Sequence, residues 1–250
     1  MTALLEVTGL SRQFGGLTAV KDVEFSVAEG EIFGLIGPNG AGKSTIFNLI
    51  NGVLAPNTGR VVFGGADITG WAPYRVVRQG LARTHQIVRP LNDMTVLENC
   101  VVGACFGRDD MPLVRARDMA REILDFVGMA DRADTLAQHL TIAHKKRLEV
   151  ARALCARPRL LLLDEVLAGL NPTEVARMID VFKAIRGRGI AILMIEHLMQ
   201  AIMSLSDRVM VLNFGAKLAE GTPREVAEDP AVVEAYLGDP DIARKLMENG

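Results

Sequence analysis

A glycine-rich stretch near the N-terminus has the residue types and spacing that bind phosphate groups. Residues 37–45 read Gly-Pro-Asn-Gly-Ala-Gly-Lys-Ser-Thr and fit the pattern G-x-x-x-x-G-K-[ST]. Glycines let the backbone approach phosphate oxygens, and the N–H groups at the start of a helix attract anions. Lys43 would reach the β- and γ-phosphates of a nucleotide, and the Ser44 hydroxyl would ligate Mg²⁺. The residues expected to contact the nucleotide here are Gly37, Pro38, Asn39, Gly40, Ala41, Gly42, Lys43, Ser44 and Thr45.

The segments on either side of this loop support a phosphate site. Residues 31–36 are apolar enough for a short buried strand, and residues 43–51 have the apolar spacing of a helix. Strand, glycine loop and helix form the usual phosphate-binding arrangement, whereas a glycine-rich turn without a ligand is the alternative. The loop alone leaves kinases, GTPases and motor ATPases open.

Two carboxylates follow a second apolar run. Residues 160–163 are four leucines, and Asp164 and Glu165 come directly after them. A continuous apolar run is typical of a central parallel strand, and ligands bind at the carboxyl ends of such strands. Asp164 would hold Mg²⁺, directly or through water, and Glu165 would orient the attacking water. A core strand that ends in a solvated acidic turn is the alternative.

Two further polar side chains end apolar runs. His197 follows the run 190–195, where an imidazole could contact the γ-phosphate and the attacking water. Gln86 follows Leu81 and Ala82 closely and could supply a side-chain oxygen to the metal and the water. Taken singly, a structural histidine and a surface glutamine remain alternatives.

Composition limits the class of protein. The 250 residues are 49% hydrophobic and 23% charged, which suits one large domain with a subdomain. The three cysteines lack zinc-site spacing, and their odd number suits a reducing compartment. The net charge of −2 argues against a nucleic-acid partner. With neither a secretory signal nor an apolar run of about 18 residues, the sequence indicates a cytosolic chain that does not span a membrane.

Periodicity and caps give the coarse organisation. Residues from about 4 to 28 and from 61 to 68 alternate as antiparallel strands do. Between 86 and 140 the pattern is helical, with a capping box at Thr95 and Glu98. The side chains expected to share one face of a helix that ends at Gly128 are Met119, Ile123, Phe126 and Val127.

The order of these motifs resembles the nucleotide-binding subunits of ABC transporters, from about Leu5 to Gly238. More narrowly, the segments 165–174, 195–197, 220–223 and 235–238 resemble the branched-chain amino-acid uptake group. The resemblance implies an α/β fold of the P-loop NTPase (ABC ATPase) type. Such a fold has a RecA-like core, an antiparallel β subdomain and an inserted helical subdomain.

Domain boundaries follow from the resemblance. One ABC ATPase domain would cover residues 1–250, with a nucleotide-binding core at 1–86 and 145–238. The helical subdomain would cover 87–144 and carry the signature segment, and residues 239–250 would form a tail.

The resemblance also implies a groove beside Gln86 that receives a coupling helix from a membrane permease. The apolar candidates for this contact are Ile87, Val88, Pro90, Leu91 and Met94. Internal packing of these side chains is the alternative.

Two further roles are implied by matching positions. Phe14 matches the aromatic residue that stacks on adenine, although a hairpin aromatic packed on the core competes with that role. Asn171 matches a residue that touches the opposite subunit of the dimer. With Pro172 and Glu174 it is also a good helix start.

The signature segment departs from the family pattern Leu-Ser-Gly-Gly-Gln, because residues 140–144 read Leu-Thr-Ile-Ala-His. Thr141 keeps a hydroxyl, Ala143 adds a Cβ where close approach to phosphate is expected, and His144 can titrate. The basic run 145–147 is expected to be a solvated helix face. In the family this segment acts in trans, so Thr141, Ala143 and Asn171 would contact ATP held by the other subunit.

The resemblance implies an ATPase that uses ATP and Mg²⁺ to drive closure of two subunits and so to power a membrane transporter. The expected partners are permease subunits, a second ATPase subunit and, indirectly, a solute-binding protein. A heterodimer is favoured because a weak signature would impair both sites of a homodimer. The chain would lie at the cytoplasmic face of the inner or plasma membrane, held there by the permease.

Three alternatives stay open. One is a lipopolysaccharide-export ATPase, and another is a non-transport ABC ATPase acting on ribosomes or DNA. The third is a regulatory nucleotide-binding subunit with weak turnover.

Overall fold

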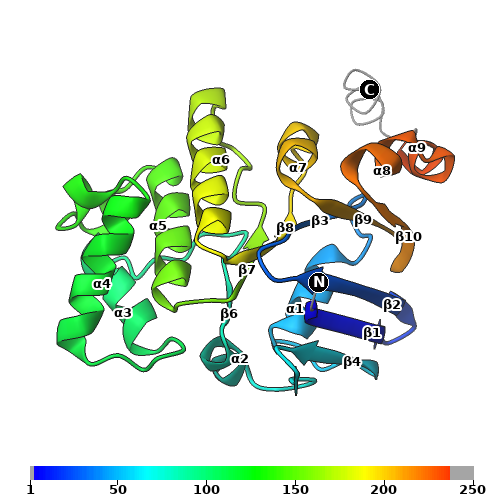
Figure 1. Ribbon diagram of the computed structural model, residues 1–250, viewed down its shortest axis with the longest axis horizontal. Helices are drawn as coiled ribbons and strands as arrows, with labels where there is room; N and C mark the ends of the chain where they lie inside the picture. The colour runs from blue at the N-terminus through cyan, green and yellow to red at the C-terminus, as the bar shows by residue number, and fades with distance from the viewer. Residues whose placement is uncertain (1–2, 237–250) are drawn as a thin grey trace. The chain divides into compact units, whose positions relative to one another are not determined.

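The computed structural model describes residues 3–236 and divides into two compact units (Figure 1). Among the described residues, the first unit combines residues 3–72 with 191–236, and the second comprises residues 73–190. The domain boundaries predicted at residues 86 and 144, with the helical subdomain 87–144, stay predictions. The predicted tail, 239–250, lies outside the described residues.

An antiparallel sheet opens the first unit. It contains β1 (Ala3–Phe14), β2 (Leu17–Ala28), β4 (Thr58–Phe63) and β5 (Ala66–Asp67), in the order β2-β1-β4-β5. Leu5 of β1 lies opposite Val27 of β2 and Phe63 of β4, and all three side chains are buried. The alternation predicted from the sequence is therefore confirmed, because one face of the sheet packs into the core.

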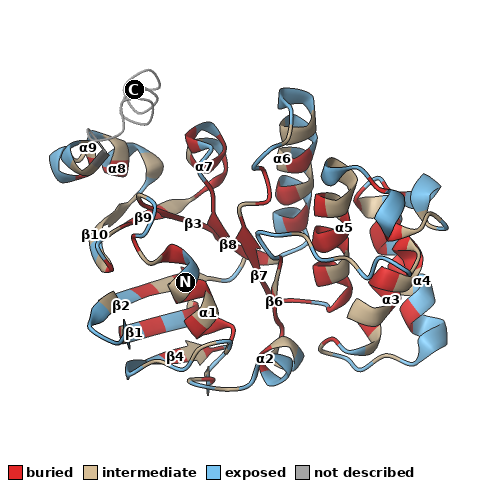
Figure 2. Cartoon of the chain, turned by 180° about the vertical axis from the view of Figure 1, so that it is seen from behind, coloured by how far each residue is buried: buried red, intermediate tan, exposed pale blue. Residues whose placement is uncertain are grey.

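The first unit also contains the strand that carries the glycine loop. Here β3 (Ile32–Ile36) lies between β8 (Ala191–Ile195) and β9 (Arg208–Asn213) and is parallel to both. The strand β10 (Ala216–Gly221) pairs antiparallel with β9. Every residue of β3 and β8 is buried, as Figure 2 shows in red. The helices of this unit are α1 (Lys43–Ile50), α7 (Met199–Leu205), α8 (Pro223–Glu228) and α9 (Pro230–Tyr236).

The second unit places three helices side by side (Figure 1). These are α3 (Val96–Cys105), α4 (Leu113–Phe126) and α5 (Ile142–Cys155). The parallel strands β6 (Leu81–Arg83) and β7 (Leu160–Asp164) pair with each other, and all of β7 is buried. The remaining elements are α2 (Pro73–Gln79), the short 3₁₀ turns η1 (Ala130–Arg132) and η2 (Ala137–His139), and α6 (Pro172–Gly187).

Helix starts in the second unit agree with the sequence. Thr95 and Glu98 form the predicted capping box of α3. Asn171 caps α6, with Pro172 in its first turn and a capping box completed by Glu174. Each cap satisfies backbone N–H groups that a helix leaves without an internal acceptor.

The buried face of α4 agrees with the predicted one at Ile123 and Val127 and differs from it elsewhere. Met119 and Phe126 are half-buried, whereas Ala116 and Ala120 are completely buried. Alanines occupy this face because α4 packs against α3 and α5, where small side chains allow close approach. The exposed side of α4 is pale blue in Figure 2.

Gly52 lets the backbone of Trp71 approach the end of α1 closely. Gly52 follows the C-cap of α1 with φ 78°, and a Cβ at this position would lie 1.9 Å from the backbone oxygen of Trp71. Glycine is therefore required both for the left-handed backbone and for the close approach.

We expect Gly52→Ala to lower the free energy of unfolding by more than the roughly 1 kcal/mol of a left-handed alanine, because the Trp71 carbonyl must also move. Gly30→Ala is the matched control, since Gly30 has φ 69° and nothing within 4 Å of its Cβ position. Urea unfolding of both variants measures the difference. Equal losses would show that the contact with Trp71 does not matter.

Candidate functional site

The glycine loop of the first unit is held in shape by its own lysine. Lys43 is buried, and its Nζ donates to the backbone oxygens of Gly37 at 2.6 Å and Pro38 at 3.0 Å. Gly42, the N-cap of α1, has φ 102°, and a Cβ there would lie 2.3 Å from the backbone oxygen of Ala19. The loop can therefore close tightly only with glycine at this position.

The start of α1 suits an anion. The first amides of a helix have no acceptor within the helix, and they carry the positive end of its dipole. No acidic residue lies in the first turn of α1, while Ser44 is exposed and Thr45 is half-buried. A phosphate group would meet N–H donors, a hydroxyl and an ammonium group at this end of the helix.

Two predicted contacts lie elsewhere in the first unit. Phe14 ends β1 and is 42% exposed, so the alternative that it packs into the core does not hold. The guanidinium carbon of Arg12 lies 4.9 Å from the centroid of the Phe14 ring, a cation–π distance. His197 follows β8 and is exposed.

Asp164, at the end of β7 in the second unit, is a buried carboxylate with a defined set of partners. Its Oδ2 accepts from Arg83 Nη2 at 2.7 Å, and its backbone N–H donates to Thr84 Oγ1 at 3.2 Å. Oδ1 is buried and has no hydrogen-bond partner among the described residues. A buried carboxylate oxygen of this kind is a suitable ligand for Mg²⁺ or for its bound water.

Glu165 has a strained backbone and a short hydrogen bond. Its φ is 50°, a left-handed value that a residue with a Cβ seldom adopts. Gln86 Nε2 donates to Glu165 Oε2 at 2.6 Å, so the structure brings together two residues that the sequence predicts for one site. This bond uses the nitrogen of the Gln86 amide, and the amide oxygen is the atom expected to reach a metal.

Lys146 corrects the prediction that residues 145–147 form a solvated face. Lys146 is buried, and its ammonium group donates to the backbone oxygens of Glu165 at 3.0 Å and Ala168 at 2.5 Å. A lysine has a flexible apolar stem, so its charged end can reach a site that its position in the sequence does not reveal. Lys146 therefore fixes the segment after β7, which includes the strained Glu165.

Sequence reasoning also missed Arg83 and Thr84. Arg83 is the last residue of β6, and Thr84 follows it, two positions before Gln86. The signal that could have identified them is the polar run that begins directly after the apolar residues Leu81 and Ala82. Thr84 is fully buried, and its backbone N–H donates to Leu162 of β7 at 2.9 Å.

The signature segment begins α5. Thr141 is the N-cap, with its Oγ1 accepting from the backbone N–H of His144 at 3.3 Å. The same Oγ1 lies 2.8 Å from His144 Nδ1. Burial lowers the pKa of His144, and the positive charges of Arg132 and Arg147 lower it further. The neutral imidazole is thus favoured, and its Nδ1 can accept the hydroxyl proton of Thr141.

Ala143 and Asn171, the other residues expected to act in trans, are less buried than the core. Ala143 is half-buried on the first turn of α5. Asn171 is exposed, although its Oδ1 accepts from the backbone N–H of Glu174 at 3.0 Å. The capping role predicted for Asn171 is confirmed.

The apolar residues after Gln86 are partly exposed. Ile87 is 68% exposed and Leu91 is 41% exposed, so neither packs internally as the alternative required. Val88, Pro90 and Met94 are half-buried.

Comparison with known proteins decides the family. A model described as ABC transporter matches residues 20–168, which is more than half of the chain. The chain belongs to the ABC transporter family. A second model, described as branched-chain amino acid ATP-binding cassette transporter, matches residues 216–242 of this ABC ATPase, although 237–242 lie outside the described residues.

Relatives match along nearly the whole ABC ATPase chain. The high-affinity branched-chain amino acid transport ATP-binding protein BraF of Pseudomonas aeruginosa is 38% identical, covering 94% of this chain and 98% of the relative. LivG of Salmonella typhimurium, which bears the same description, is 39% identical over the same shares. The lipopolysaccharide export system ATP-binding protein LptB of Acidithiobacillus ferridurans is 32% identical, covering 96% and 98%.

Solved structures agree on the fold. A crystal structure of the ADP conformation of an ATP-binding cassette of an ABC transporter superposes with a TM-score of 0.86 at 31% identity. The match covers 96% of this chain and 100% of that structure. The predicted α/β P-loop NTPase fold of the ABC ATPase type is thereby confirmed.

We expect the pKa of His144 in the folded chain to lie below the ordinary value of about 6.5, because burial and two arginines disfavour the imidazolium. An NMR titration of the imidazole measures this pKa, and Arg132→Gln should raise it. The neutral form then stabilises the fold above about pH 6.5, and this contribution is lost as pH falls through the folded pKa. A pKa at or above 6.5 in the native chain would contradict the assignment.

Proposed function

We propose that this chain is the ATP-binding and ATP-hydrolysing subunit that energises an ABC transporter for uptake of branched-chain or related amino acids. The observation that carries the proposal is the match of the branched-chain family model at residues 216–242, in addition to the general ABC transporter match. Relatives at 38–39% identity carry the same description over 94% of the chain. The match to a lipopolysaccharide export relative is weaker, at 32% identity.

The proposed nucleotide contacts start from the glycine loop. The backbone amides of residues 37–45 and the Lys43 ammonium would hold the phosphates, because both are donors that a polyanion attracts. Phe14 would stack on the adenine, for which its exposure is suitable. Arg12 lies against the Phe14 ring and would keep the aromatic in place.

Mg²⁺ would accompany ATP, and oxygen ligands suit it. The proposed ligands are the Ser44 hydroxyl, the Gln86 amide oxygen and Asp164, whose Oδ1 is the buried acceptor described above. When bound, the ion neutralises charge on the phosphates.

Hydrolysis is assigned to Glu165, with Gln86 and His197 as assisting residues. The Glu165 carboxylate would accept a proton from the attacking water, and Gln86 holds one of its oxygens at 2.6 Å. Lys146 keeps the backbone of Glu165 in place. His197 would contact the γ-phosphate.

The signature segment supports a heterodimer. In the neutral state of His144, the Thr141 hydroxyl proton is directed to Nδ1 rather than to a phosphate. Ala143 adds a methyl group where a glycine would leave room. A dimer has two ATP sites, and each uses the signature segment of the opposite subunit. A partner ATPase subunit with a stronger signature would restore the site that holds ATP on this chain. Thr141, Ala143 and Asn171 of this chain would contribute only to the other site.

The transporter would be completed by permease subunits and, outside the membrane, by a solute-binding protein. No helix among the described residues is long and apolar enough to cross a bilayer. We propose that the chain is held at the cytoplasmic face of the membrane by the permease, with Ile87 and Leu91 as exposed apolar contacts.

The test of this proposal uses the complex captured with ATP from detergent-solubilised native membranes. Mass spectrometry should identify permease subunits and a second ATPase, and the associated binding protein should bind leucine, isoleucine or valine. Recovery with lipopolysaccharide-export, ribosomal or DNA-repair proteins would refute the transport assignment.

Lys43→Ala should weaken ATP binding to the purified chain by at least about tenfold, because a buried phosphate contact is lost and the loop loses two hydrogen bonds. Calorimetric titration with ATP and Mg²⁺ measures the change. Lys21→Ala is the control, since Lys21 is an exposed lysine of the same unit. Unaltered affinity in Lys43→Ala would exclude the loop assignment.

Glu165→Gln should reduce ATP turnover of the assembled complex by about 10²-fold or more while leaving ATP binding nearly unchanged, because only the proton acceptor is removed. Phosphate release and nucleotide binding are measured on the same preparation, with the exposed Glu24→Gln as control. Full turnover in Glu165→Gln would remove this residue from the catalytic role.

A further inference from the structure

The second unit contains a cavity that shares no residue with the glycine loop or with the residues assigned to hydrolysis. It lies between the middle of α4, the end of α5 and the segment that follows α6, and its volume is about 490 Å³. Cavities of this size accept small molecules.

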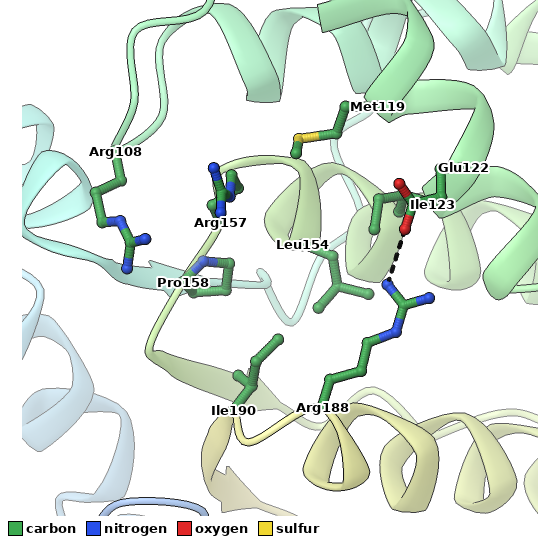
Figure 3. A pocket seen from close by; sticks show the side chains of 9 residues that line it. All are labelled: Arg108, Met119, Glu122, Ile123, Leu154, Arg157, Pro158, Arg188 and Ile190. Carbon is green, nitrogen blue, oxygen red and sulfur yellow. Dashed lines mark hydrogen bonds and ion pairs between the residues drawn. The ribbon is translucent and has the colours of Figure 1, made fainter.

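Charged and apolar side chains are separated within this cavity (Figure 3). Arg108 and Arg157 stand at one end, and Arg188 with Glu122 stands at the other. Apolar side chains lie between the two ends, including Met119, Leu154 and Ile190.

The two ends differ in net charge. At the first end Asp109 pairs with both Arg108, at 3.3 Å, and Arg157, so two cations face one carboxylate. One net positive charge remains there. At the second end Arg188 Nη1 lies 3.5 Å from Glu122 Oε1, and its guanidinium carbon lies 3.8 Å from the Phe126 ring centroid. The opposite charges of this pair cancel, so that end carries no net charge.

The backbone of Arg157 strengthens the argument. Arg157 follows the C-cap of α5 with φ 53°, a left-handed position where glycine is the favoured residue. Its N–H donates to the backbone oxygen of Leu154 at 2.9 Å, as expected after a helix end. The chain thus keeps a strained arginine at a place where glycine would be easier, and strain of this kind tends to accompany a functional side chain.

We propose that this cavity binds a small amphiphilic monocarboxylate. The ligand carboxylate accepts from guanidinium N–H groups of Arg108 and Arg157 other than those that donate to Asp109, and the apolar body contacts Met119, Leu154 and Ile190. A single negative charge on the ligand balances the net positive charge at the end with Arg108 and Arg157. The end with Arg188 and Glu122 is neutral, so the ligand needs no second charge there. The site is distinct from that for ATP, so it adds to the proposed function and does not depend on it.

Octanoate is the probe, with 1-octanol and octylamine as neutral and cationic controls of the same length. Calorimetry on the full chain should give saturable octanoate binding with Kd at or below about 1 mM, at least about tenfold tighter than either control. The ¹³C-labelled methyl group of Met119, assigned from a Met119→Leu spectrum, should shift as octanoate is added. Equal binding of the three compounds, or no saturable binding of octanoate, would overturn the proposal.

Arg157→Gly is the decisive variant, because glycine suits the left-handed backbone and should leave the fold at least as stable. It should weaken octanoate binding by at least about tenfold and leave ATP affinity unchanged. Arg115→Ala removes an exposed arginine of α4 outside the cavity and should bind octanoate like the native chain. Arg108→Gln replaces Arg157→Gly if the latter does not fold, as judged by circular dichroism. Native affinity in a folded variant at either position would refute the site.

Discussion

The second unit depends on compensation of one buried charge, that of Asp164. Burying an unpaired carboxylate is so unfavourable that removing the partner of such a pair typically destabilises a protein by about 3–5 kcal/mol. Arg83 supplies the countercharge at 2.7 Å, and Thr84 accepts the backbone N–H of Asp164. Because Arg83 ends β6 and Asp164 ends β7, the ion pair joins the ends of two parallel strands. Gln86 is brought to Glu165 as a result.

Those parts of the fold and site that depend on neighbouring residues could be predicted from the sequence. The glycine loop and α1 are encoded by consecutive residues, and the caps at Thr95 and Asn171 are encoded over three residues. The leucine run before Asp164 predicts a strand covered on both faces, and β7 is completely buried. Such signals depend only on neighbouring residues, so they can be recognised without knowledge of the tertiary structure.

Contacts between distant residues could not be predicted in this way. Arg83 and Asp164 are 81 positions apart, and nothing in either neighbourhood specifies the other. Lys146 looks like one member of a basic surface run, because a sequence shows a charge but not where a flexible stem directs it. The alanine face of α4 was missed for a related reason. Hydrophobic size suggested Met119 and Phe126, whereas close helix packing required Ala116 and Ala120.

The buried Lys146 has a mechanical consequence. Lys146 lies five residues after Thr141 on the same helix, or about 7.5 Å along its axis. Its ammonium group donates to the backbone oxygens of Glu165 and Ala168, so it ties helix α5 to the segment after β7. Under the proposed contact of Thr141 with a nucleotide of a neighbouring subunit, this tie would connect that contact to the segment that holds the Glu165 carboxylate.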